Sequence, residues 1–123
     1  MKSDIYTKKD VEQLVNLFYE KVQEDKLLSP LFARVNWELH LPVMYQFWEN
    51  VIFFAGGYIG NPMAAHILLH KRTALNHEHF SHWTLLFNNT VDELFQGNKA
   101  ELAKQRAYSI ATVMQTKILT PQQ

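Results

Sequence analysis

One stretch near the N-terminus decides the fold class: TKKDVEQLVNLFYEKV, residues 7–22. Its apolar residues recur at spacings of three and four, which places them along one face of a helix. These residues are Val11, Leu14, Val15, Phe18 and Val22. Thr7 is suited to cap the helix, and Asp10 lies in its first turn, where a negative charge is favourable. The stretch therefore predicts an amphipathic helix that packs against other elements.

Helical spacing continues beyond this stretch. We predict that the first helix ends before Ser29-Pro30 and that a short turn then carries Leu31 and Phe32. A second helix is predicted over about residues 41–54. Pro42 would lie in its first turn, where the missing N–H costs little.

Three more helices follow in the second half of the chain. They are predicted over about residues 62–71, 77–97 and 99–118. Asn76 would cap the middle one, with Leu75 and Phe80 at the spacing of a hydrophobic staple. Asn98 and Glu101 have the spacing of a capping box for the last one. With no alternating strand pattern, the chain is predicted to be all-α, a single domain over residues 1–123.

Composition narrows the possible functions. Hydrophobic residues make up 47% of the chain, which predicts a packed core. The formal net charge is zero, so neither nucleic acid nor an anionic membrane surface is expected as a partner. The chain has no cysteine, which excludes disulfides, thiolate nucleophiles and Cys-type zinc sites. The longest apolar stretch is far too short to span a bilayer, so we expect a soluble cytoplasmic protein. We also expect a monomer.

Histidines are the strongest metal ligands that this chain offers. They are His40, His66, His70, His77, His79 and His82. His66 follows small and apolar residues in NPMAAHILL, residues 61–69, so its imidazole can face an apolar pocket and hold an iron. A partly buried helix histidine bonded to a backbone carbonyl is the alternative.

Other histidine arrangements point less clearly to a metal. His66 and His70 are four residues apart, a spacing that can bind zinc, although the Glu of the zinc-protease motif is missing. His77, His79 and His82 lie around a predicted helix start, where capping and surface roles compete with a metal site.

A second group combines polar tips with largely apolar side chains: Tyr19, His40 and Trp83, with Met44 beside them. Around a buried space, such side chains can donate hydrogen bonds to a ligand. Core packing with the polar tip bonded to backbone is the alternative for Tyr19 and Trp83.

Short stretches in a fixed order give the chain a family resemblance. They are FYEKV (18–22), PLF (30–32), HLP (40–42), FW (47–48), Tyr58, GNPM (60–63), His66, HF (79–80), Trp83, LF (86–87), RA (106–107) and IA (110–111). The chain resembles the truncated haemoglobins, the 2-on-2 globins of bacteria, and within them group III. The resemblance extends over about residues 4–117.

This resemblance implies a two-on-two helical sandwich around haem b. His66 matches the proximal iron ligand, and the distal ligand-binding side chains would be Tyr19, His40 and Trp83. The haem-contacting side chains would be Phe32, Met44, Phe47 and Trp48. Lys71 and Arg72 could pair with the haem carboxylates or be a solvated charge pair at a helix end.

The function implied is reversible binding of oxygen, nitric oxide or carbon monoxide at a five-coordinate iron, as in oxygen transport. One alternative is haem-dependent nitric oxide dioxygenase or peroxidase-like activity, which would need a separate reductase or peroxide. Another is a haem-free, histidine-rich helical domain for protein interaction or zinc binding. Tight, slowly released oxygen is expected if Tyr19 and Trp83 both donate hydrogen bonds to it.

Overall fold

The computed structural model describes residues 2–53 and 75–119. Within these ranges it contains helices and no strand, as the all-α prediction requires. The elements are α1 (Lys8–Glu24), the 3-10 helix η1 (Ser29–Phe32), α2 (Trp37–Phe53), α4 (His77–Leu94) and α5 (Asn98–Leu119). The helix predicted over residues 62–71 lies outside the described residues. None of the described helices is both long and apolar enough to cross a membrane.

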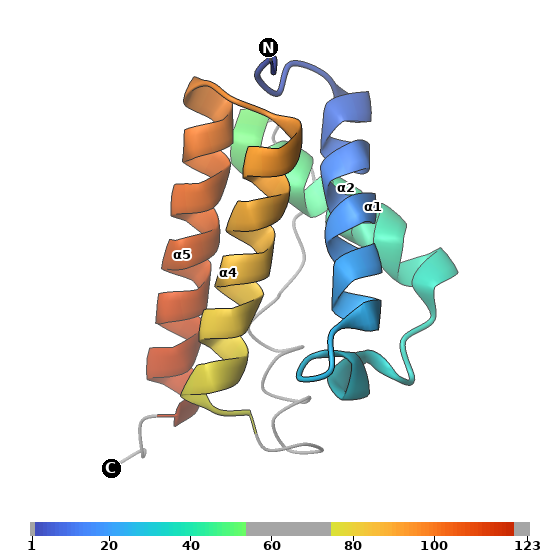
Figure 1. The fold of residues 1–123 in the computed structure, drawn as a ribbon, viewed down its shortest axis with the longest axis vertical. Coiled ribbons are helices and arrows are strands. Elements are labelled where there is room, and N and C mark those ends of the chain that lie inside the picture. The colour runs from blue at the N-terminus through green and yellow to red at the C-terminus, as the bar shows by residue number, and fades with distance from the viewer. Residues whose placement is uncertain (1, 54–74, 120–123) are drawn as a thin grey trace.

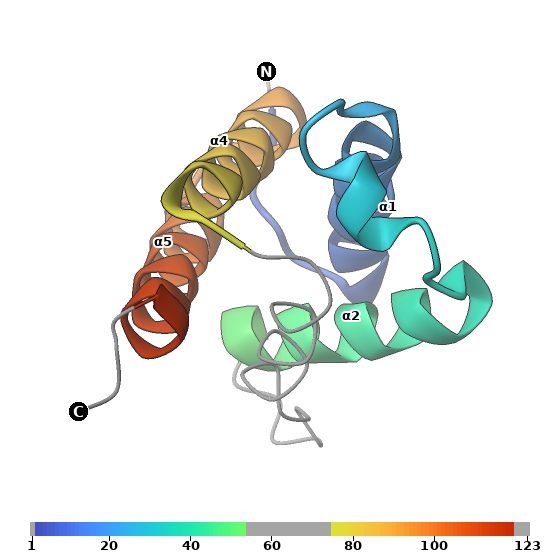
Figure 2. The same cartoon turned by 90° about the horizontal axis from the view of Figure 1, so that it is seen from below.

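The long helices are arranged as two packed pairs. Helices α4 and α5 run antiparallel, side by side, and α1 packs against both α2 and α4. Figure 2 shows α2 running across one side of the other helices rather than along them, and it also contacts α5. The α1–α2 pair thus faces the α4–α5 pair, and the largest buried side chains fill the space between them.

Helix α1 forms as the sequence predicts. The Thr7 hydroxyl accepts a hydrogen bond from the Asp10 N–H at 3.2 Å, and the Asp10 carboxylate accepts one from the Thr7 N–H at 3.0 Å. This reciprocal capping box satisfies donors that the first helical turn leaves unpaired. The apolar face is buried throughout, and Tyr19, which borders it, is buried as well.

Helix α2 begins earlier than predicted, and the predicted place of Pro42 in its first turn is wrong. The carbonyl of Asn36 accepts hydrogen bonds from the N–H groups of Leu39 and His40 at 3.1 and 2.9 Å, so the helix already starts at Trp37. Pro42 therefore falls in the second turn. It is exposed there and costs one helix hydrogen bond, the one its missing N–H would have made.

Helix α4 has the predicted start. The Asn76 side chain accepts a hydrogen bond from the His79 N–H at 3.1 Å, and His79 Nδ1 accepts one from the Asn76 N–H at 3.0 Å. Leu75 and Phe80 are both buried in one small hydrophobic cluster, as the staple spacing predicts. The helix ends at Leu94 rather than at Gly97.

The start of α5 is capped by a residue from the other end of the sequence, so the predicted capping box of Asn98 and Glu101 is wrong. The Asp4 carboxylate accepts hydrogen bonds from the N–H groups of Lys99 and Ala100 at 2.9 and 2.8 Å. Gly97 has a φ of +145°, and a Cβ there would lie 2.5 Å from Asp4 Cγ. Only glycine leaves room for this carboxylate.

Candidate functional site

Four rings from three elements meet at the open end of the α1–α2 pair. We call Tyr19, Phe32, Trp37 and His40 the Tyr19 cluster. The Tyr19 ring centroid lies 5.2 Å from that of Trp37, 5.6 Å from that of His40 and 6.1 Å from that of Phe32. Helix α1 supplies Tyr19, η1 supplies Phe32, and the first turns of α2 supply the other two. Three residues that the family resemblance assigns to the site, Tyr19, Phe32 and His40, therefore lie together.

Tyr19 is the most enclosed polar side chain of the cluster, only 5% exposed. Its ring belongs to the main hydrophobic core, so both the core-packing alternative and a distal role for its hydroxyl stay predictions. Burial raises the pKa of Tyr19, because a phenolate would lose its hydration there. The hydroxyl therefore stays protonated at neutral pH and can donate to a ligand.

His40 lies edge-on against two rings. Its plane makes angles of 81° with Tyr19 and 76° with Trp37, and the side chain is half-buried. The backbone N–H of His40 is fixed by the carbonyl of Asn36. The ring position of His40 is thus set by its aromatic neighbours together with the first turn of α2.

Trp83 reaches the Tyr19 cluster through Phe18. Its ring centroid lies 5.7 Å from that of Phe18, which in turn lies 4.9 Å from that of Tyr19. Trp83 also stacks on Phe87, at 5.9 Å and 16°. The structure therefore places Trp83 beside the cluster, one ring removed from Tyr19.

The other predicted pocket residues continue this aromatic layer into the core. Trp48 stacks on Phe87 at 4.5 Å and 20°, and Phe47 packs edge-on against Trp48. Phe47 and Trp48 are buried, and Met44 is half-buried against the same core. Rings thus extend without a break from His40 to Phe47.

Several predicted site residues cannot be located. His66, the predicted iron ligand, and His70, Lys71 and Arg72 all fall within residues 54–74, outside the described residues. The structure therefore describes the predicted distal side of the site and not the proximal side.

The three histidines of α4 each have a local partner. His77 hydrogen-bonds with Gln115 and Ser81, His79 takes part in the Asn76 cap, and His82 pairs with Asp25. Among the described residues, no group of three His, Asp or Glu side chains is placed to hold a metal. For His77 and His79 this arrangement matches the capping and surface alternative.

The His82–Asp25 pair connects α4 to the corner between α1 and η1. His82 Nε2 lies 2.5 Å from Asp25 Oδ2, while Asp25 Oδ1 accepts hydrogen bonds from the N–H groups of Leu27 and Leu28, both at 2.9 Å. Burial alone would raise the pKa of Asp25, but the hydrogen bonds from His82 and the two backbone N–H groups outweigh it and hold that pKa below its usual value. The pair stabilises the turn that leads to Phe32.

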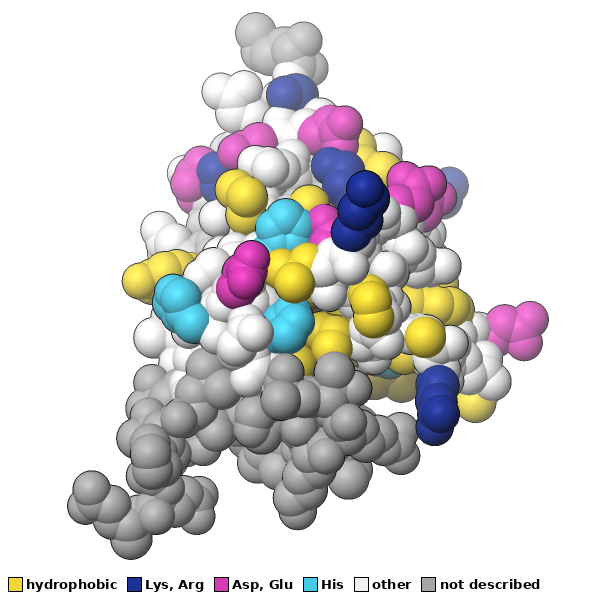
Figure 3. Space-filling model, turned by 60° about the horizontal axis from the view of Figure 1, so that its bottom comes forward, with side chains coloured by type: hydrophobic (Ala, Val, Ile, Leu, Met, Phe, Trp, Pro, Cys, Tyr) yellow, Lys and Arg dark blue, Asp and Glu magenta, His cyan; other side chains and the backbone are white. Residues whose placement is uncertain are grey.

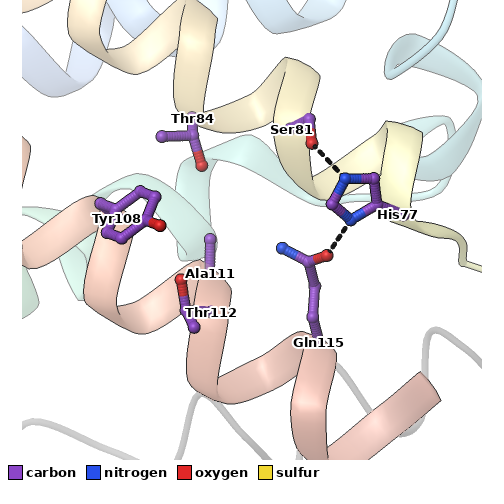
Figure 4. Close-up of a pocket in the computed structure, with 7 residues that line it drawn as sticks. All are labelled: His77, Ser81, Thr84, Tyr108, Ala111, Thr112 and Gln115. Carbon is purple, nitrogen blue, oxygen red and sulfur yellow. Dashed lines mark hydrogen bonds between the residues drawn. The ribbon is translucent and has the colours of Figure 1, made fainter. Parts of the chain in front are cut away.

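A separate groove of about 410 Å³ lies between α4 and α5, on the surface. Figure 4 shows its lining residues: His77, Ser81, Thr84, Tyr108, Ala111, Thr112 and Gln115. It contains polar groups, several bonded to one another or to backbone; the Thr84 hydroxyl, for example, donates to the Phe80 carbonyl at 2.9 Å. Figure 3 shows histidine and hydrophobic side chains exposed together on the lower face of the molecule.

Sequence reasoning missed one member of the Tyr19 cluster, Trp37. It stacks on Phe32 at 5.9 Å and 24° and contacts both Tyr19 and His40. The signal that could have found it is the spacing of three residues between Trp37 and His40. This spacing places both residues on one helix face, provided that the helix starts at Trp37.

Comparisons with known proteins agree with this geometry. A family model described as "Bacterial-like globin" matches residues 4–118. A curated protein, "Group 3 truncated hemoglobin ctb" of Campylobacter jejuni, is 27% identical over 96% of this chain and 95% of its own length. The crystal structure of a group III truncated haemoglobin from Campylobacter jejuni superposes with a TM-score of 0.83, at 27% identity over 96% of this chain and 95% of that one.

These findings confirm the globin fold and the resemblance to group III truncated haemoglobins. Globins bind small ligands through haem, so membership in the family implies haem binding here as well. The chain belongs to the bacterial-like globin family.

Proposed function

We propose that this chain reversibly binds a diatomic gas, oxygen first and also nitric oxide or carbon monoxide, at the iron of haem b. The single observation that carries the proposal is the enclosure of Tyr19, which is 5% exposed and packs among the rings of Phe32, Trp37 and His40. A hydrogen-bond donor in such apolar surroundings gains much from a ligand that accepts its hydrogen bond. Family membership supplies the cofactor class.

The described residues fit a haem. A porphyrin is large, flat and mostly apolar, and the layer from Phe32 to Trp48 offers the aromatic faces that suit it. When bound, haem supplies an iron with one coordination position open to a small ligand. We assign His66 as the iron ligand, from its place among small and apolar residues. Phe32, Met44, Phe47 and Trp48 are proposed as the wall of the haem pocket.

Tyr19 is proposed as the main donor to the gas. Its raised pKa keeps the proton on the hydroxyl, and its aromatic neighbours exclude the water that would compete for it. A hydrogen bond to a partly negative ligand atom contributes about 1.5–3 kcal/mol. His40 lies beside Tyr19 and Trp83 lies one ring away, so we assign both as additional distal residues.

The same donor favours a second candidate, turnover of nitric oxide. A ligand that is held tightly and polarised by Tyr19 stays long enough to react. One nitric oxide and one oxygen would then give nitrate with one electron from a separate reductase. An electrode that follows nitric oxide in the presence of a reductant separates this candidate from simple binding. Turnover of added peroxide tests the peroxidase-like counterpart in the same way. The haem-free zinc alternative involves His66 and His70, which lie outside the described residues, so a test of zinc binding by the purified protein distinguishes it.

An absorption spectrum of purified protein with haem quantified tests the proposal. We expect a Soret band in the native chain and its loss in His66→Ala. His77→Ala is the matched control, because His77 is bonded to Gln115 and Ser81 on the outer surface. A Soret band that survives unchanged in His66→Ala would contradict the assignment of the iron ligand, and no haem uptake by any variant would overturn the proposed function.

A further inference from the structure

We propose that Trp37 is a positioning residue that confines His40 and Tyr19 and thereby controls how fast a small ligand enters and leaves. The inference rests on the proposed function, because it concerns passage to that same site. It adds a residue that neither the resemblance nor the comparisons assign.

The geometry of the Tyr19 cluster gives Trp37 this role. Its ring contacts every other member: Tyr19 at 5.2 Å, His40 at 5.6 Å and Phe32 at 5.9 Å. The contacts differ in kind, since the indole stacks on Phe32 but meets His40 edge-on, at 76°. Trp37 therefore joins η1, α1 and α2 at one point.

The place of Trp37 in the helix explains why it acts on His40. It is the first residue of α2, and His40 follows on the same face, less than one turn later. The backbone of this turn is held by the Asn36 carbonyl, which accepts the N–H groups of both Leu39 and His40. Because the backbone is fixed, the His40 ring can move mainly by rotation of its side chain, and the rings of Tyr19 and Trp37 are among the groups that resist that rotation.

Trp37 is also the more exposed of the two rings that confine His40. Tyr19 is buried, whereas Trp37 is half-buried. We infer that a ligand passing beside His40 on this side would displace the Trp37 ring more readily than the buried Tyr19 ring. Trp37 is thus placed as a barrier to ligand passage, while Tyr19 holds the hydrogen-bond donor.

This division of roles has a kinetic signature. A barrier residue changes the association and dissociation rates together and leaves their ratio nearly constant, because it contacts neither the iron nor the ligand. A donor changes mainly the dissociation rate and the affinity. Losing the indole contacts of His40 should raise both rates roughly two- to tenfold.

Flash photolysis for association and ligand displacement for dissociation, both with carbon monoxide on the haem-loaded protein, measure these rates. Trp37→Ala should accelerate both by similar factors, and Trp37→Phe, which keeps a ring, should stay within about twofold of native. Tyr108→Ala, an exposed aromatic residue of the α5 surface, is the control and should change neither rate. Unchanged rates in Trp37→Ala, or a change in dissociation alone, would overturn the proposal.

Nuclear magnetic resonance of the His40 ring gives a readout that needs no ligand kinetics. In protein labelled at histidine, with His40 assigned by His40→Gln, Trp37→Ala should shift and average the His40 signals, since the indole ring current and its steric restraint are lost. Unchanged His40 signals would contradict the inference. If Trp37→Ala loses helix content, Trp37→Leu, which keeps apolar bulk without an aromatic plane, serves for both measurements. A missing Soret band in the native protein would contradict the proposed function. Unchanged His40 signals would contradict the role of Trp37, so the two failures are distinguishable.

Discussion

The Tyr19 cluster and the groove between α4 and α5 contain the same residue types in opposite settings. Tyr19 is 5% exposed and Tyr108, in the groove, is 65% exposed. His40 packs against aromatic rings, whereas His77 bonds to Ser81 and Gln115 across the groove. The groove therefore exposes its polar groups to solvent and to one another, while Tyr19 is enclosed by aromatic rings.

This difference teaches which polar side chains indicate a ligand site. A hydroxyl that bonds to neighbouring side chains or to water loses little if no ligand arrives. A hydroxyl enclosed by rings gains most from a ligand, because no water competes for it. The comparison therefore supports our proposal that a gas would bind on the α1–α2 side of the molecule.

The largest expected effect separates the two regions by stability. Phe18 is fully buried and contacts Tyr19, Trp83 and Phe87, so Phe18→Ala should lower the free energy of unfolding by about 3–5 kcal/mol. Tyr108→Ala in the groove should change it by no more than about 0.5 kcal/mol. Urea unfolding followed by circular dichroism measures both. Equal effects would show that the groove belongs to the core and would break the comparison.

An intermediate effect is expected at the His82–Asp25 pair. Both side chains are partly buried, so His82→Ala should cost about 1–2 kcal/mol, against about 0.5 kcal/mol or less for His77→Ala. The same urea titrations give both values. Similar costs for the two histidines would mean that the pair does not hold the α1–η1 corner.

The pH dependence of this pair sharpens the prediction. The pKa of Asp25 is lower in the folded protein than its usual value of 3.8, so the stabilisation it provides is present above about pH 4 and is lost as pH falls through the folded value. Asp25→Asn should therefore reduce stability most at neutral pH and progressively less below pH 4. A gap between native and variant that stays constant down to pH 2 would exclude this carboxylate as the source.

A smaller effect is expected from Tyr19 in alkali. Its pKa is raised above the usual 10.0, so the stability that follows from its neutral state is present below pH 10 and is lost as pH rises above it. Above pH 10 native stability should fall by up to about 1.4 kcal/mol per pH unit more steeply than that of Tyr19→Phe. Urea unfolding between pH 8 and 11.5 checks the slope, and identical slopes would mean that Tyr19 is open to solvent.

Local signals in the sequence predicted much of this fold. The spacing of apolar residues and the caps at Thr7 and Asn76 located the starts of α1 and α4, because those caps bond within three residues. The start of α5 was beyond such reasoning, since its cap is Asp4, a residue near the other end of the chain. Tertiary contacts of this kind leave no periodic trace.

The candidate site was predictable only in part, because its residues come from separate elements. Tyr19, Phe32 and His40 were predicted through the family resemblance; their rings lie together in the structure, and their roles stay predictions. Trp37 was missed because Pro42 was taken to mark the helix start, which left Trp37 outside the helix. The Asn36 carbonyl sets the true start, and this interaction depends on the backbone path after η1.

Oxygen dissociation from Tyr19→Phe and Tyr108→Phe, measured side by side by stopped flow on haem-loaded protein, tests the central claim most directly. Each change removes one hydroxyl, the first from the ring-enclosed cluster and the second from the exposed groove. The dissociation rate should rise roughly ten- to hundredfold in Tyr19→Phe, in keeping with a lost donor to a charged partner, and stay at the native value in Tyr108→Phe. A native dissociation rate in Tyr19→Phe would contradict the account and remove this hydroxyl from ligand binding.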